Sequence, residues 1–380
     1  MTNLKITLTS WAPFIGGAEV AVERLAMGLS AAGHQVLLVV GTDGEALARF
    51  RDAGIRCEFV PQQFTDKLKW LQYRRSRHAL MEVLRREEPD VVHSNDLPSH
   101  QMTSDAARRL GIPRVCHHRW IFEGSAIEWL NKFDADRHLF VSQALMRMLC
   151  RESGQLQDSS RAVVYDGLPL PETPCEDDQF VAKRRLGLDP SKLLVLFAGQ
   201  IIERKGVADL LQAWARLPRH AEQAELVIAG DDLEGEGAYR RQMENLAREL
   251  NCTAQFVGFQ KNIPEWLTAA DIVTVPSHAE PLGNATLEAM AHARPVIGGD
   301  VGGIPEMVLD GETGLLVPPK SPDQLAQALQ QLLAEPELRQ LMGQAARRRC
   351  EEMFSLDAHV QAVLAEYQII LQHSSTGVAV

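Results

Sequence analysis

Short apolar runs alternate with amphipathic stretches along the chain, which indicates strands and helices in turn. In the first part, strands are predicted at 5–9, 35–40, 57–60, 90–94, 114–117, 138–142 and 162–165. Helices are predicted near 18–32, where Gly33 follows, and near 67–87, where Pro89 follows. This order of elements predicts a parallel, doubly wound sheet.

The alternation stops at residues 166–190, which are rich in proline and acidic residues and predict a linker. It then resumes with a helix whose apolar face carries Val207, Leu210, Leu211 and Trp214. Strands are predicted at 193–198, 225–230, 254–257, 272–275, 296–298 and 315–317. The chain closes with helices near 322–334, 337–353 and 356–373.

The length of 380 residues suits two α/β domains better than one core. We expect an N-terminal domain at 1–167, a linker at 168–190, a second domain at 191–354 and a C-terminal helix and tail at 355–380. Packing of this last segment on the N-terminal domain is left open. The predicted fold class is α/β, with two Rossmann-like domains facing across a cleft that strand-end loops line.

Composition narrows the class of protein. Apolar residues make up 45% of the chain and charged residues 23%, as in ordinary soluble proteins. The apolar runs are strand-length, the N-terminus has no signal-peptide core, and the six cysteines form no C-x-x-C pair, so we expect a cytoplasmic protein with reduced thiols. The net charge of −11 argues against general nucleic-acid binding.

The segment 276–290, PSHAEPLGNATLEAM, follows an apolar strand and leads into a helix. Asn284 is the expected N-cap, and Gly283 allows backbone to come close to a ligand. The amides of such a helix start favour an anion such as a diphosphate. Glu280 in the loop and Glu288 about one turn into the helix suit sugar hydroxyls. Taken alone, the two glutamates could equally be a solvated loop residue and a partner of the helix dipole.

Two other loops follow strands and open helices. Arg204 and Lys205 stand side by side before a helix, where they could clamp a diphosphate or lie on a solvated surface. Gly16 and Gly17 follow the first strand, where they allow close approach to phosphate or simply make a tight turn. Neither loop is the G-x-G-x-x-G dinucleotide motif.

In order along the chain, these motifs resemble the retaining glycosyltransferases of family 4, which have the two-domain GT-B fold. The resemblance covers nearly the whole chain and is strongest in the second half. There the E-x7-E pattern runs from Glu280 to Glu288, and it is followed by Arg294-Pro-Val-Ile, by 301–306, VGGIPE, and by 310–319, DGETGLLVPP.

The resemblance implies roles for single residues. Glu280 would contact donor-sugar hydroxyls, Glu288 would hold the nucleotide ribose, and Lys205 would bind the diphosphate and stabilise the leaving group. Backbone around Leu282, Gly283 and Asn284 would cradle phosphate and sugar. Gly16 and Gly17 would close on the diphosphate from the other domain, and His118 would lie at the sugar with its ring or its backbone.

Three departures from the family pattern stand out. Gln200 follows Gly199 where the family commonly has arginine, and Arg204 could replace that charge. His117 and His118 are adjacent, and we prefer His118 at the ligand with His117 packed in the sheet. Asp166-Gly167 stands where the family often has Asn-Gly.

The family implies front-face attack assisted by the departing phosphate. We expect no metal, because Lys205 and the helix amides would stabilise the charge, and no cofactor, because the nucleotide sugar is a co-substrate. The Asp-x-Asp sequence at 134–136 precedes a strand, so we interpret it as a surface turn. An epimerase or a phosphorylase on the same fold, and a non-enzymatic nucleotide-sugar sensor, remain alternatives. A nicotinamide dehydrogenase lacks support because no G-x-G-x-x-G follows a strand.

The acceptor is open: a sugar, a lipid-linked acceptor or a small molecule. Trp120, Phe122 and Trp129 could stack on a sugar or pack inside the domain. Residues 64–86 carry seven basic and two acidic side chains with interleaved aromatics. This segment is either a core-packing helix with a solvated basic face or a peripheral contact with the inner face of a membrane.

Overall fold

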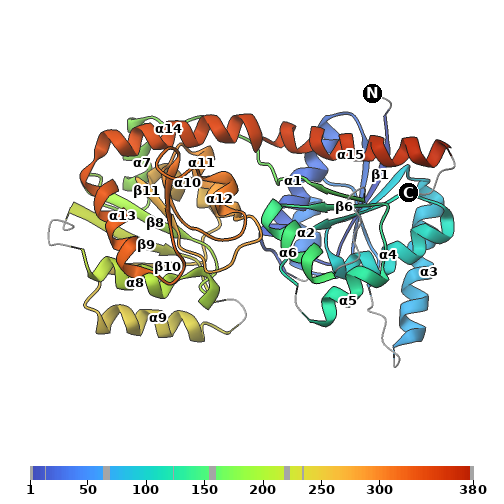
Figure 1. Ribbon diagram of the computed structural model, residues 1–380, viewed down its shortest axis with the longest axis horizontal. Coiled ribbons are helices and arrows are strands. Elements are labelled where there is room, and N and C mark those ends of the chain that lie inside the picture. Colours follow the sequence, from blue (N-terminus) through green and yellow to red (C-terminus); the bar gives the residue numbers. More distant parts are fainter. Residues whose placement is uncertain are drawn as a thin grey trace. The chain divides into compact units, whose positions relative to one another are not determined.

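The computed structural model describes residues 3–12, 14–62, 69–122, 124–153, 160–217, 223–232 and 235–376, without the side chains of residues 125, 126, 129 and 373–376. It divides into two compact units (Figure 1). Unit 1 comprises Met1–Pro169 with Ser355–Val380, and unit 2 comprises Leu170–Phe354. Each unit is an α/β fold with one parallel sheet.

Unit 1 has a seven-stranded sheet in the order β3-β2-β1-β4-β5-β6-β7. The strands are β1 (Lys5–Ser10), β2 (Gln35–Val40), β3 (Cys57–Phe59), β4 (Val91–Ser94), β5 (Arg114–His118), β6 (Arg137–Phe140) and β7 (Arg161–Val163). The helices are α1 (Gly17–Ala31), α2 (Glu45–Asp52), α3 (Trp70–Glu87), α4 (Leu97–Leu110), α5 (Ser125–Lys132), α6 (Gln143–Ser153) and α15 (Leu356–Thr376).

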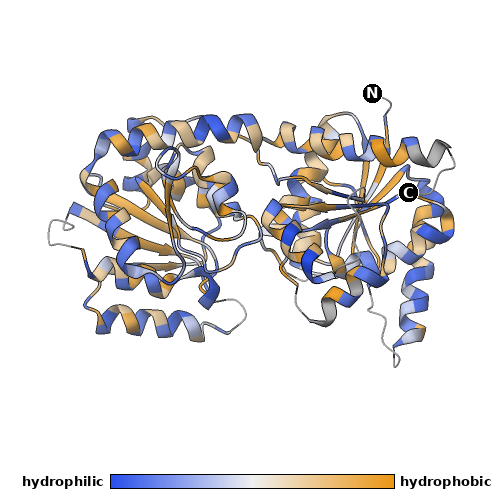
Figure 2. Cartoon of the chain, viewed as in Figure 1, coloured by the Kyte–Doolittle hydropathy of each residue, from blue (hydrophilic) through white to orange (hydrophobic). Residues whose placement is uncertain are grey.

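Both faces of β2 are buried, which explains why this strand is an almost continuous apolar run, and Figure 2 colours the strand interiors mostly hydrophobic. In β2, Leu38 and Val40 pack with α1 and α2, whereas Leu37 and Val39 point to the other face and pack with α3 and α4. The alternation follows from the two-residue period of a strand.

Helix α15 supplies part of the core of unit 1. Val360, Val363 and Tyr367 are buried in the same apolar cluster as the inward face of α1. The two helices lie close together because α1 has a glycine at the crossing: a Cβ on Gly28 would lie 2.6 Å from Val360 Cγ2 (Figure 1). The last helix of the sequence therefore belongs to the first unit.

Unit 2 has a six-stranded sheet in the order β10-β9-β8-β11-β12-β13. The strands are β8 (Leu193–Ala198), β9 (Ala224–Ala229), β10 (Ala254–Gly258), β11 (Ile272–Val275), β12 (Val296–Gly299) and β13 (Gly314–Val317). The helices are α7 (Glu176–Arg185), η2 (Glu203–Lys205, a 3-10 turn), α8 (Val207–Ala215), α9 (Ala238–Glu249), α10 (Ile263–Ala269), α11 (Asn284–Ala291), α12 (Ile304–Met307), α13 (Pro322–Ala334) and α14 (Pro336–Met353).

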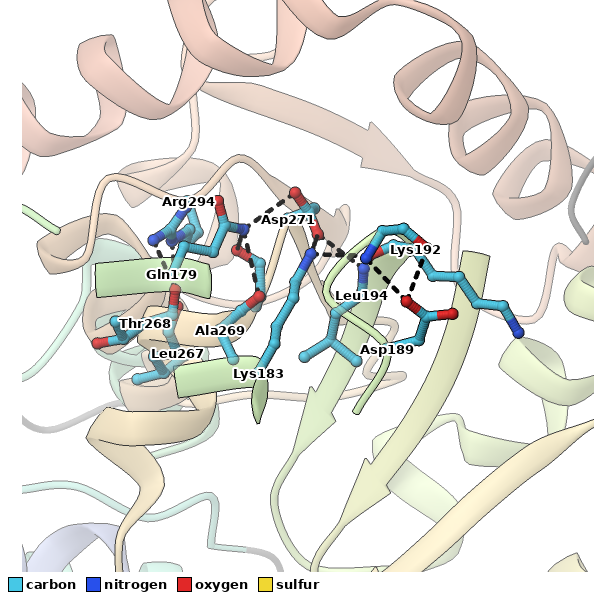
Figure 3. A network of polar contacts seen from close by, with 12 residues as sticks. Gln179, Lys183, Asp189, Lys192, Leu194, Leu267, Thr268, Ala269, Asp271 and Arg294 are labelled. Carbon is cyan, nitrogen blue, oxygen red and sulfur yellow. Dashed lines mark hydrogen bonds and ion pairs between the residues drawn. The ribbon is translucent and has the colours of Figure 1, made fainter. Parts of the chain in front are cut away.

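The structure differs from the prediction of a linker at residues 168–190. Residues 176–185 form α7, which is anchored to the amino end of the unit 2 sheet (Figure 3). Lys183 Nζ lies 2.7 Å from Asp271 Oδ2, and Gln179 Nε2 donates to Asp271 Oδ1 at 3.0 Å. The same Asp271 oxygen that contacts Lys183 accepts from the backbone N–H of Leu194 at the start of β8. The side chain of Lys183 is only 6% exposed, so this segment is part of the unit and not a free connection.

Among the described residues, no helix combines the length and the apolarity that crossing a bilayer requires. All six cysteines are free thiols.

Candidate functional site

The polar loops of unit 2 gather at the carboxyl ends of β8, β11 and β12, the edge at which open α/β sheets bind ligands. The loop after β8 contains Gln200, which is half-buried, and leads into η2. Hydrogen bonds from the N–H of Gly199 to Ala229 and from the N–H of Ile201 to Asp231 fix this loop against the end of β9. These two hydrogen bonds therefore hold the backbone on both sides of Gln200 in place.

The loop between β11 and α11 brings Glu280 onto Lys205. Lys205 Nζ lies 2.9 Å from Glu280 Oε1 and 2.8 Å from Oε2, so one ammonium contacts both carboxylate oxygens. Arg204 reaches the same carboxylate, with Nη1 at 3.5 Å from Oε2. Exposure falls from 43% for the Arg204 side chain to 17% for Lys205 and 8% for Glu280. The Glu280 carboxylate is thus held by two cations in a partly buried environment, where charge-assisted hydrogen bonds are strong.

Two glycines allow the backbone to close around Glu280. A Cβ on Gly206, whose φ is 72°, would lie 1.9 Å from the carbonyl oxygen of Pro276. A Cβ on Gly302, whose φ is 55°, would lie 1.7 Å from the carbonyl oxygen of Glu280. Any side chain at either position would push the loop away, so glycine is required there.

Helix α11 begins at Asn284, and Gly283 is its N-cap, with a φ of 110°. The expectation of Asn284 as the N-cap is therefore wrong by one residue, because the left-handed turn that starts the helix suits glycine and not a side chain with a Cβ. Leu282 is buried at 3% exposure and packs in the interior. Glu288 is half-buried, one turn into α11. The helix start and both glutamates lie on one loop-and-helix segment, as the sequence predicted.

In unit 1, Gly16 is the N-cap of α1, and Gly17 is the first residue of that helix. The N–H of Gly16 donates to Glu19 Oε2 at 3.0 Å. Glu19 is 4% exposed, and burial raises the pKa of its carboxyl group. The turn is thus fixed by its own helix, and the role of both glycines at a diphosphate stays a prediction.

Comparison with known proteins covers both units. Residues 15–170 match the family described as Glycosyltransferase Family 4, and residues 178–349 match Glycosyl transferases group 1. A D-inositol 3-phosphate glycosyltransferase of Frankia alni is 32% identical over 78% of this chain and 80% of its own length. The chain belongs to the family 4 glycosyltransferases.

Two further similarities extend over the whole glycosyltransferase. An uncharacterized glycosyltransferase of Methanocaldococcus jannaschii is 25% identical over 97% of this chain and 99% of its own length. The crystal structure of Anabaena HepE in complex with UDP and glucose covers 97% of this chain and 100% of its own, with a TM-score of 0.85 and 21% identity. The family and the GT-B fold expected from the sequence are confirmed.

In the histidine pair of the glycosyltransferase, His117 is packed as we expected, whereas the ring of His118 is also buried, and a role for the His118 backbone at the sugar stays a prediction. His117 and His118 are both fully buried. The ring of His118 stacks on Phe140, and its Nε2 lies 3.0 Å from Nδ1 of His138. Burial holds the pKa of His118 well below its usual value. Its ring therefore does not face open space, because the side chain points into the layer between sheet and helices.

Cys116, His118 and His138 form a group whose ligand atoms lie within 4.8 Å of one another, and among the residues that the structure describes it is the group that a metal ion could fit. Burial raises the pKa of the Cys116 thiol, and the two imidazoles already bond to each other.

The Asp-x-Asp sequence lies before β6, and there Asp136 pairs with Arg114 at 3.0 Å. Asp136 is thus engaged in a structural ion pair.

Our reading of the sequence missed a buried ion pair at the carboxyl edge of the unit 1 sheet. Arg119, one residue after β5, has Nε 3.0 Å from Asp166 Oδ1 and Nη1 3.0 Å from Asn95 Oδ1. The Arg119 side chain is 2% exposed and that of Asp166 is 6% exposed. Nearby, Asp96 caps α4 by accepting from the N–H of Ser99. The available signal was a charged residue within three positions after a strand: Arg119 after β5, Asp96 after β4 and Asp166 after β7.

Proposed function

We propose that this glycosyltransferase moves a sugar from a nucleotide-diphosphate sugar to an acceptor hydroxyl with retention of configuration, and without a metal ion. The observation that carries the proposal is the contact of Lys205 and Arg204 with Glu280 beside the start of α11. Two cations and a helix N-terminus suit a diphosphate, and a carboxylate suits sugar hydroxyls. Crystal structures of HepE hold UDP and UDP-glucose, which supports a donor of this class.

In this proposal the donor takes over the contacts of the ion pair. The diphosphate approaches Lys205, which then shares its three N–H groups between phosphate oxygens and Glu280. Glu280 accepts hydrogen bonds from hydroxyls of the donor sugar, and Glu288 accepts from those of the ribose. The main-chain N–H groups around Leu282, Gly283 and Asn284 face the phosphates, where the helix dipole favours negative charge. Gln200 supplies a neutral contact where the family has a cation.

The chemical step breaks the bond between the anomeric carbon and the phosphate oxygen. The acceptor oxygen bonds to the same face of that carbon, and its proton passes to the departing phosphate. Lys205 stabilises the negative charge that collects on the leaving diphosphate. Preorganised donors of this kind contribute about 2.7–4 kcal/mol each in comparable sites.

A turnover assay tests the proposal directly. The purified protein is incubated with UDP-, GDP- and ADP-sugars and a panel of glycosides, alcohols and lipid acceptors. We expect transfer from one nucleotide class, with the anomeric configuration of the donor kept in the product, as NMR would show, and with activity retained in EDTA. Net isomerisation of the donor would identify an epimerase, and transfer that requires inorganic phosphate would identify a phosphorylase. Binding without turnover would identify a sensor.

For the acceptor we propose a surface that includes Trp120, two residues after β5. Its side chain is 39% exposed, and its ring packs edge-to-face on Phe14 with centroids 6.2 Å apart. An exposed, braced indole offers a flat apolar face for a sugar ring. Phe122 instead packs against His118, and the side chain of Trp129 lies outside the described residues. Acceptor KM should rise in Trp120→Ala while donor KM stays constant.

We propose that the protein is cytoplasmic and that α3 provides a peripheral membrane contact. Residues 64–68 lie outside the described residues. Within α3, Arg77, Arg85 and Arg86 are already paired with acidic side chains. Trp70 and Leu71 are 50% and 55% exposed, and the Arg74 guanidinium lies 5.3 Å from the Trp70 ring centroid. Liposome co-sedimentation with and without anionic lipid tests this. Equal, negligible binding would reject the contact.

A further inference from the structure

The loop that carries Glu280 is attached to the start of α8 by contacts other than the Lys205 ion pair. The backbone N–H of His278 donates to the carbonyl oxygen of Arg204 at 2.7 Å. Gly206 lies directly against the Pro276 carbonyl, where a Cβ would not fit. Main-chain contacts thus join the segment before Glu280 to the segment that contains Lys205.

A side-chain bond reinforces this attachment. His278 Nε2 lies 2.6 Å from Asp209 Oδ2, and the two side chains are 16% and 15% exposed. Asp209 follows Lys205 by four residues, and His278 precedes Glu280 by two. The bond therefore joins the same two segments as the Lys205–Glu280 pair, from the neighbouring positions.

The two bonds differ in what a substrate does to them. Under the function proposed above, a diphosphate competes with Glu280 for Lys205, so their ion pair weakens when the donor binds. The donor is not proposed to contact His278 or Asp209, so donor binding leaves the bond between them intact. It can keep the loop in place while the ion pair opens.

We propose that His278 and Asp209 are positioning residues that hold the Glu280 loop against α8 during the reaction. They touch neither donor nor acceptor, and they act by fixing the distance between the Glu280 carboxylate and Lys205. A displacement of about 1 Å in such a site can cost about 100-fold in rate. The inference rests on the proposed function, because its effect is read in the chemical step.

A double-mutant cycle tests the pair. His278→Ala, Asp209→Ala and the double variant are compared with the wild type for kcat, donor KM and nucleotide binding by calorimetry. We expect each single change to lower kcat by about 10- to 100-fold, with nucleotide affinity within about threefold. The double variant should be no slower than the worse single variant, because residues that act as a unit are non-additive. Asp323→Ala removes an exposed ion pair with Arg216 beyond the other end of α8 and is the matched control.

The conservative variant His278→Gln separates positioning from loss of fold. Its amide nitrogen can replace Nε2 and bond to Asp209, so kcat should recover by about 10-fold relative to His278→Ala if only that bond matters. Multiplied losses in the double variant, or wild-type kcat in both single variants, would overturn the proposal. So would a fall in kcat that merely follows a fall in folded fraction. If the wild type turns over no nucleotide sugar, the proposed function fails and the pair is not implicated.

Discussion

Lys205 and Glu280, 75 residues apart in the sequence, meet as an ion pair with both carboxylate oxygens within 2.9 Å of the ammonium. Each was assigned to the donor, and in the structure each is the other's partner. The pair keeps the two charges satisfied at the partly buried carboxyl edge of the sheet. Under the proposed function, donor binding would exchange the partners of these two charges and would not fill an unpaired charge.

Removing the cation should affect chemistry most. We expect Lys205→Ala to lower kcat by about 100- to 1000-fold, the usual loss for one charge-stabilising donor. Lys192→Ala, which removes a half-buried lysine paired with Glu225 in the same unit, is the control and should keep wild-type turnover. Turnover that disappears in EDTA and returns with magnesium or manganese would contradict the metal-free mechanism.

Substitutions of Glu280 and Glu288 should affect different steps, turnover in one case and nucleotide binding in the other. Glu288→Ala should weaken nucleotide binding, measured by calorimetry, because its assigned contact is the ribose. Glu280→Ala should mainly lower kcat, because its assigned contact is the sugar at the reacting centre. A folded Glu280→Ala variant with normal turnover would remove Glu280 from the donor site.

The Asp271 network of Figure 3 should control the stability of unit 2. Asp271→Ala leaves the Lys183 ammonium, which is 6% exposed, without its carboxylate. Breaking a buried pair from one side typically costs about 3–5 kcal/mol. We expect a lower midpoint of denaturant unfolding for this variant, and a smaller loss for Glu225→Ala, which breaks the less buried pair with Lys192. Equal midpoints would show that α7 contributes little to the unit.

Unit 1 should lose stability at mildly acidic pH. Burial lowers the pKa of six of its histidines, which are His93, His100, His117, His118, His138 and His359. The unfolded chain then binds protons that the folded chain does not, beginning near the ordinary value of 6.5. The stability that these groups contribute is complete above that pH and is lost as the pH falls toward the folded values, about 4 for His100 and about 3 for His138.

Unfolding free energies measured from pH 7.5 to 4.5 test this. His138→Phe should reduce the slope of stability against pH by up to one proton, and replacement of the exposed His78 by glutamine is the comparison variant. A slope that is the same for both variants would show that His138 does not titrate on unfolding.

The strands were the part of the fold that the sequence predicted best. Strands buried on both faces leave uninterrupted apolar runs, so β8 and β11 were assigned within a residue. The linker prediction failed at α7, because that helix packs through polar bonds from Gln179 and Lys183 and so lacks an apolar stripe. Its charge pattern was the usable signal: three acidic residues in the first turn and three basic residues in the last complement the helix dipole.

At the candidate site, the residue types were predictable and their partners were not. Glu280, Glu288 and Lys205 lie in local patterns that a strand-loop-helix unit imposes. That Glu280 bonds to Lys205 depends on which strands are neighbours, and β8 next to β11 is a choice made by the whole sheet. For the same reason the burial of the His118 ring could not be foreseen, because it depends on Phe140 and His138 of the adjacent strand.

The position of helix α15 in the sequence affects the order in which the two units can fold during synthesis. Unit 2 is encoded without interruption, whereas unit 1 is split, with its last helix separated from β7 by the whole of unit 2. Until residues 360–367 emerge, the inward face of α1 and the sheet beneath it lack part of their cover. During synthesis the N-terminal sheet therefore stays incompletely covered while unit 2 emerges, and the emergence of α15 supplies the missing part of its core.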